Sequence, residues 1–77
     1  MYKDLIEYLA KSLVDNPDEV EVREREEDEA VLLELCVNQK DLGKVIGRQG
    51  KTARAMRTIL GAAAAKEGRR ASLEIVE

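Results

Sequence analysis

The chain has 77 residues with one Cys, no His, Trp or Phe, and a formal net charge of −3. A chain of this length buries only about 60% of the surface that its unfolded form exposes, so we expect one small domain with an aliphatic core. The single Cys36 excludes an internal disulfide, and the lack of His and further Cys leaves no metal cluster. This cysteine usage makes a reducing, cytoplasmic setting the default expectation. Because the first turns are charged and no apolar run is long, we expect no signal peptide and no membrane span.

Charge is distributed unevenly along the chain. Residues 1–39 carry four Lys/Arg against twelve Asp/Glu, whereas residues 40–70 carry nine Lys/Arg against two Asp/Glu. An asymmetry of this size predicts one surface that meets a polyanion and another that repels it. The alternative is that exposed helices are simply solvated by whichever charge is available.

The first half of the chain predicts a helix followed by two strands. Residues 3–14 have an amphipathic helical pattern, and Asn16-Pro17 ends it because the residue before proline is disfavoured in the α region. Residues 19–26 alternate and are highly charged, which is typical of an exposed edge strand. An acidic turn leads to residues 30–38, the most apolar strand, which we expect at the centre of the sheet.

The second half predicts two helices and a last strand. Asn38 is a suitable N-cap for a short helix, and Asp41 is favourably placed near the positive end of that helix. A glycine loop follows, and residues 51–66 form the longest helix, ended by Gly68. Its apolar stripe consists of Ala53, Met56, Ile59, Leu60, Ala63 and Ala64. Residues 71–76 alternate again as the last strand.

The predicted order is therefore α-β-β-α-α-β. The first two strands can form a hairpin, and the helical crossover to the third strand favours a parallel, right-handed connection. One face of the sheet is more apolar than the other, so we expect the three helices on that face. The fold class is α+β, a two-layer sandwich with a three-stranded mixed sheet.

The most informative motif is Val45-Ile46-Gly47-Arg48-Gln49-Gly50-Lys51-Thr52. Its two glycines allow another backbone to approach closely, and the free amides of the next helix can face an anion. The end of the motif resembles a P-loop, but Val45 stands where a P-loop requires glycine. A helix-turn-helix for duplex DNA is the second interpretation, although Arg54 and Arg57 are its only candidate base readers.

The third interpretation is a GxxG clamp on single-stranded nucleic acid, in which cations hold phosphates and the bases fall toward an aliphatic groove. The motif resembles the KH-domain signature, and α-β-β-α-α-β is the type II, bacterial arrangement of that fold. Together with the segment Leu13-Val14-Asp15-Asn16-Pro17-Asp18-Glu19-Val20, it makes the whole chain similar to the KhpA family, small single-KH proteins of bacteria.

This resemblance implies a single KH domain over residues 1–77 that binds single-stranded RNA without catalysis, cofactor or small-molecule substrate, in post-transcriptional regulation. It also implies dimerisation, either with itself or with a larger multidomain KH protein. The clamp would be Gly47, Arg48, Gln49 and Gly50, flanked by Lys44, Lys51 and Arg54, with Val45, Ile46 and Ala53 lining the groove. Because Ala53 is smaller than the large aliphatic residue of the general pattern, we expect a shallow, permissive groove.

Two other functions remain open on the sequence alone. One is a protein-interaction or dimerisation module in which the KH fold is mainly a scaffold, and the other is a DNA-binding domain. Gly61, inside the longest helix, suggests the close approach of another helix or chain. The basic residues Lys66, Arg69 and Arg70 lie in the loop that borders the groove in type II KH domains, where they either contact phosphate or are solvated.

Overall fold

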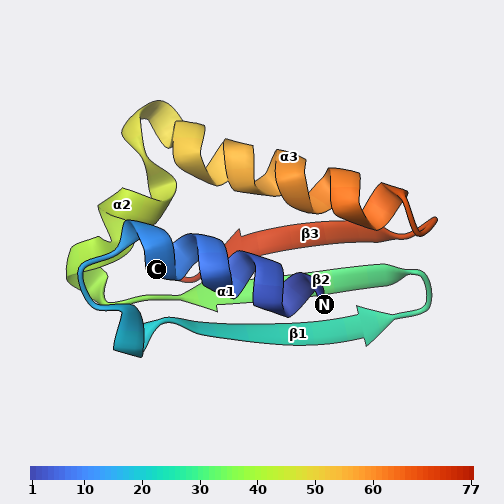
Figure 1. Cartoon of the computed structure of the whole chain (residues 1–77), viewed down its shortest axis with the longest axis horizontal. Coiled ribbons are helices and arrows are strands. Elements are labelled where there is room, and N and C mark those ends of the chain that lie inside the picture. Colours follow the sequence, from blue (N-terminus) through green and yellow to red (C-terminus); the bar gives the residue numbers. More distant parts are fainter.

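Three helices and three strands follow one another in the predicted order in the computed structural model, which describes all residues from 1 to 77 (Figure 1). Their bounds are α1 Tyr2–Leu13, β1 Glu21–Glu27, β2 Ala30–Cys36, α2 Leu42–Ile46, α3 Lys51–Ala65 and β3 Arg70–Ile75. Short 3₁₀ turns at Pro17–Glu19, Gln39–Asp41 and Arg48–Gly50 precede β1, α2 and α3. The predicted α+β class and element order are confirmed.

The sheet has the order β1-β2-β3, with β1 antiparallel and β3 parallel to the central strand. Leu33 of β2 lies opposite Glu24 of β1 and Leu73 of β3, which fixes the register on the inner face. The edge position of β1, the central position of β2 and the parallel crossover are as predicted. β1 begins two residues later than expected, because Pro17–Glu19 form a 3₁₀ turn.

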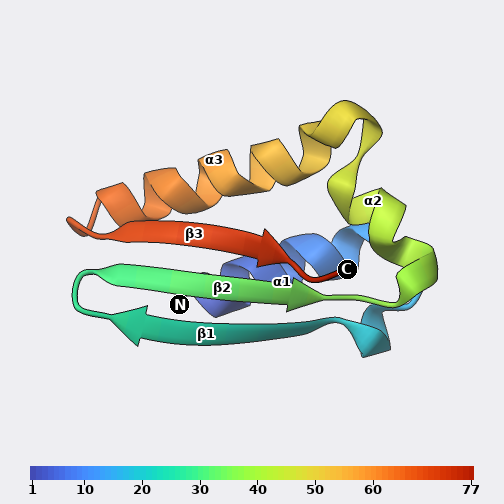
Figure 2. The same ribbon diagram turned by 180° about the vertical axis from the view of Figure 1, so that it is seen from behind.

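The core lies between one face of the sheet and the helices α1 and α3. Figure 2, the view from behind, shows the strands in front and the helices on their far side, so one sheet face is left open. On β2 the buried residues alternate with half-buried ones that face the open side. The fully buried larger side chains on the inner side are Ile6, Val31, Leu33, Leu35, Val45 and Leu60. None of the helices is long and apolar enough to cross a membrane.

One predicted core residue of α3 is not in the core. Ala53, Met56, Leu60 and Ala64 are buried, but Ile59 is 45% exposed. Successive residues of an α-helix point about 100° apart, so the residue before Leu60 turns away from the sheet unless a neighbour covers it. The buried face of α3 is therefore narrower than the apolar pattern suggested.

Candidate nucleic-acid interface

The glycine loop joins α2 to α3 at one end of the molecule (Figure 1). Three of its four residues have positive φ: Gly47 at 78°, Gln49 at 59° and Gly50 at 74°. Left-handed backbone conformations are uncommon for residues with a side chain, so the loop has a tightly constrained shape. This constraint presents the side chains of Arg48 and Gln49 at an exposed tip.

Glycine suits the two loop positions for different physical reasons. A Cβ on Gly47 would lie 2.8 Å from the backbone nitrogen of Thr52, so the close approach at this position comes from the protein itself. A Cβ on Gly50 would meet no heavy atom within 4 Å. Gly50 therefore faces open space, and of the two glycines it is the one beside which a ligand backbone has room.

The backbone amides of the loop are less available than the sequence suggested. The N–H of Gly50 donates to the carbonyl oxygen of Gly47 at 3.1 Å, and the N–H of Lys51 donates to that of Arg48. Both bonds belong to the 3₁₀ turn that precedes α3. The expectation that the amides at the start of α3 are free is wrong for these two, so an anion at the tip would depend mainly on side chains.

Exposed cations surround the loop. Arg48, Lys51 and Arg54 are all exposed, and the guanidinium of Arg54 donates to the carbonyl oxygen of Gln49 at 3.4 Å, which holds it beneath the tip. Lys44 differs from them, because its Nζ lies 3.1 Å from the carboxylate of Asp15. The structure thus brings three exposed cations together at the loop and gives the fourth predicted one an acidic partner.

A cavity of about 290 Å³ lies directly beside the loop. Its lining comes from the end of α2, the first turns of α3 and the end of β3: Ile46, Gly50, Ala53, Arg54, Arg57, Ile75 and Glu77. Ile46 and Ala53 therefore lie where a groove lining was predicted. Val45 does not, because it is fully buried in the core between the sheet and the helices.

Three residues of this cavity had not been assigned to it from the sequence. Arg57 continues the i, i+3 row of cations on α3, so helical spacing could have indicated it. The Nε of Arg57 donates to the carbonyl oxygen of Leu73 at 3.1 Å, which ties α3 to the outer edge of β3. Ile75 and Glu77 reach the cavity because β3 ends beside the start of α3, which only the tertiary fold reveals.

The start of α2 is held by a buried carboxylate. Asp41 is 1% exposed and accepts hydrogen bonds from the backbone amides of Asp15 and Asn16 and from the Asn16 side chain. Burial acts to raise the pKa of Asp41, but the hydrogen bonds from Asn16 and Asp15 and the charge of Lys44 outweigh it, so the pKa is lowered. Asn38 was predicted as the N-cap of the short helix, but it caps the 3₁₀ turn Gln39–Asp41 through the bond from the Lys40 amide, and Asp41 is the N-cap residue of α2.

The basic residues after α3 lie far from the loop. They follow the opposite end of α3 (Figure 1), and none of them lines the cavity beside the loop. Arg69 pairs with Glu26 at 2.8 Å and stacks over the Tyr2 ring at 5.9 Å from its centroid, while the Tyr2 hydroxyl donates to Glu67. This cluster joins the start of α1, the end of α3 and β1.

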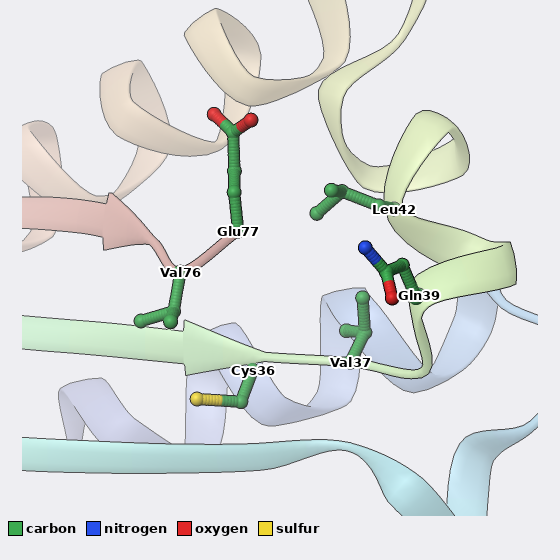
Figure 3. A pocket seen from close by; sticks show the side chains of 6 residues that line it. All are labelled: Cys36, Val37, Gln39, Leu42, Val76 and Glu77. Atoms are coloured by element: carbon green, nitrogen blue, oxygen red, sulfur yellow. The ribbon is translucent and has the colours of Figure 1, made fainter.

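A second cavity, of about 220 Å³, lies between the ends of β2 and β3 and the turn before α2 (Figure 3). Its lining contains no cation and consists of Cys36, Val37, Gln39, Leu42, Val76 and Glu77. Glu77 is thus part of the wall of both cavities. In Figure 3 its side chain points away from Cys36, toward the side on which α3 lies.

The α-β-β-α-α-β order, the mixed three-stranded sheet and the glycine loop between α2 and α3 define the class of this protein as a KH-type domain. The family model described as KhpA/KhpB, KH domain, matches residues 3–75. The chain belongs to this KhpA/KhpB KH-domain family.

Individual relatives agree with this assignment. A protein of Aquifex aeolicus named RNA-binding protein KhpA is 55% identical over 75 residues, which cover 97% of this chain and 95% of the relative. A protein of the same name from Borreliella burgdorferi is 54% identical over 74 residues, covering 96% of this chain and 90% of its own. The crystal structure of Aquifex aeolicus Era shares the fold, with a TM-score of 0.66 at 17% identity over 96% of this chain and 29% of that one.

Proposed function

We propose that the chain binds single-stranded RNA without catalysis, gripping the sugar-phosphate backbone at the Gly47–Gly50 loop, and that it acts in post-transcriptional regulation in the cytoplasm. One observation carries the proposal: the open surface of Gly50 lies among the exposed cations Arg48, Lys51 and Arg54, directly beside a cavity whose lining combines three apolar side chains with charged ones. The relatives named RNA-binding protein KhpA support RNA as the polyanion.

The geometry favours an unpaired strand over a duplex. Cations at the tip can neutralise successive phosphates, and the neighbouring cavity can take bases only if those bases are unpaired and turned away from a complementary strand. Its apolar floor comes from Ile46, Ala53 and Ile75, and no aromatic ring lines it. Without stacking aromatics the expected binding is weak, because base stacking on an aromatic contributes about 1–3 kcal/mol per base.

The double substitution Arg48→Asp with Gln49→Asp tests this proposal. Both side chains are exposed at the tip, so the fold should persist while two carboxylates repel phosphate. We expect RNA binding, measured by fluorescence anisotropy with a labelled single-stranded oligonucleotide, to be lost, and the far-UV circular dichroism spectrum to be unchanged.

A matched control lowers the net charge of the protein by the same amount, at positions away from the loop. Arg23→Asp with Ser72→Asp changes two exposed residues of the open sheet face, on β1 and β3, and we expect it to weaken RNA binding only slightly. Unchanged binding by the loop variant would overturn the clamp, and so would an equal loss in both variants, because the effect would then be one of net charge alone.

A further inference from the structure

The cavity beside the glycine loop contains one carboxylate among its cations. Glu77 shares the lining with Arg54 and Arg57 and with the apolar side chains of Ile46 and Ile75. The carboxylate of Glu77 takes part in none of the ion pairs or hydrogen bonds between side chains of the structure. A carboxylate that no arginine neutralises is a hydrogen-bond acceptor available to a ligand, and it is unfavourable to a phosphate.

Arg57 is the fixed donor of the same cavity. Its Nε is held by the carbonyl oxygen of Leu73 at 3.1 Å, and a guanidinium has five N–H donors in a rigid planar arrangement. The bond to β3 therefore uses one donor and fixes the plane of the group. The other donors are left for a ligand that enters between α3 and β3.

An ionised carboxylate only accepts hydrogen bonds and a guanidinium only donates them. Cytosine and adenine both carry an exocyclic amino group next to a ring acceptor, whereas uracil carries a carbonyl oxygen where cytosine has its amino group. Side chains read such edges in the same way elsewhere, with Glu or Asp accepting from the cytosine amino group. The cavity thus offers an acceptor and a donor that match an amino-bearing base.

We propose that Glu77 and Arg57 select the base held in this cavity, Glu77 by accepting from the exocyclic amino group of cytosine or adenine and Arg57 by donating to the adjacent ring acceptor. Uracil is disfavoured because its carbonyl oxygen would face the Glu77 carboxylate. The proposal rests on the RNA-binding function above and adds to it a preference that a shallow aliphatic groove alone would lack.

The experiment compares the Kd values of labelled eight-nucleotide oligomers of cytidine, adenosine and uridine by fluorescence anisotropy. We expect the unmodified protein to bind the cytidine and adenosine oligomers about fivefold or more tightly than the uridine oligomer, the lower end of what one good base contact supplies. In Glu77→Gln the side-chain amide can donate as well as accept, so the ratio should fall toward one. In Glu77→Lys it should reverse in favour of uridine.

Glu74→Gln is the matched control. Glu74 is an exposed residue of β3 whose place in the register, beside Glu34, puts it on the open sheet face. Glu74→Gln removes the same charge as Glu77→Gln but away from the cavity. All three Kd values should therefore change by one common factor, and the ratio between the oligomers should stay the same. Arg57→Lys keeps the charge but loses the planar group, so it should reduce the ratio and leave the salt dependence of binding unchanged.

Equal affinities of the unmodified protein for the three oligomers, or an unchanged ratio in Glu77→Gln, would overturn base selection while leaving RNA binding intact. Failure of the unmodified protein to bind any of the oligomers would overturn the RNA-binding function itself, and base selection with it. The two failures are therefore distinguishable within one set of titrations.

Discussion

The carboxylate of Asp41 accepts two hydrogen bonds from Asn16, one from its backbone amide and one from its side-chain amide, both at 3.0 Å. Asn16 lies in the connection after α1, and Asp41 lies directly before α2. Their bonds join two segments that are distant in sequence and fix the start of the helix that leads into the glycine loop. A buried carboxylate thus fixes the start of the helix that leads into the proposed RNA site.

We expect Asp41→Asn to lower the melting temperature by several degrees and to change how stability depends on pH. The folded-state pKa of Asp41 is below its ordinary value of 3.8, so its contribution to stability is fully present above about pH 4. That contribution is lost as the pH falls through the folded-state pKa. Thermal unfolding between pH 2 and pH 7 should therefore show a steeper acid-side decline for the unmodified protein than for Asp41→Asn.

Asp18→Asn provides the control for this measurement. Asp18 is exposed in the same connection and accepts none of the bonds that hold Asn16. We expect its stability profile to follow that of the unmodified protein. Identical acid-side profiles for all three proteins would show that ionisation of Asp41 adds nothing to stability.

Alanine substitutions of glycine should fall into a definite order of stability. Gly47→Ala combines a positive φ with a Cβ placed 2.8 Å from the Thr52 nitrogen, so it should destabilise most, by about 1–3 kcal/mol or more. Gly50→Ala has the positive φ but open space and should cost about 1–2 kcal/mol. Gly61→Ala lies inside α3 with nothing near its Cβ and should stabilise by about 1 kcal/mol. Chemical denaturation of the three variants gives these differences directly.

The same series tests whether another helix or chain packs against Gly61. Its sequence position suggested the close approach of another helix or chain, and within this chain nothing lies within 4 Å of a Cβ placed there. If the free energy of unfolding of Gly61→Ala rises without any dependence on protein concentration, helix propensity alone describes the position. A fall in stability would contradict the prediction and would require a contact from another molecule.

The elements of this fold could be predicted closely because local signals agree with the tertiary structure. The alternation of Val31, Leu33 and Leu35 marks the central strand, and Gly68, with φ of 70°, ends the turn after α3. Such signals depend on the period of the side chains and on the backbone preferences of single residues. The exposure of Ile59 could not be predicted, because it depends on which part of α3 its neighbours cover.

The loop residues of the candidate site could also be identified from the sequence, whereas their surroundings could not. Glycine spacing and charge indicated the tip, but Val45 and Ile46 are adjacent and only their orientation decides that one is buried and the other lines the cavity. No sequence pattern indicated that Glu77 would lie at the site. Its position depends on the parallel pairing of β3 with β2, which brings the residues after β3 beside the start of α3.

We expect Arg69→Ala to lower stability and to leave RNA affinity nearly unchanged. The guanidinium of Arg69 bonds Glu26 and stacks over Tyr2 at the end of α3 opposite the glycine loop. Its pKa is raised, chiefly by the hydrogen bond to Glu26, although burial opposes that effect. Arg54→Ala is the comparison, because it should weaken RNA binding with little effect on the melting temperature. Loss of RNA affinity in Arg69→Ala at intact fold would place a phosphate contact at the far end of α3.

The pair of Lys44 and Asp15 should reduce the number of cations that RNA uses. If Arg48, Lys51 and Arg54 each contact one phosphate, log Kd should change with log salt concentration by a slope near 2, at about 0.7 per contact for a single strand. Lys44 is held 3.1 Å from the Asp15 carboxylate, so Lys44→Ala should change this slope little. Asp15→Asn frees Lys44 and should tighten binding and raise the slope by about 0.7, provided that Lys44 then reaches a phosphate. The double variant Asp15→Asn with Lys44→Ala is the control, because it removes the repelling carboxylate without releasing a lysine. It should keep the slope of the unmodified protein. A steeper slope in the double variant would show that Asp15 acts on the RNA directly.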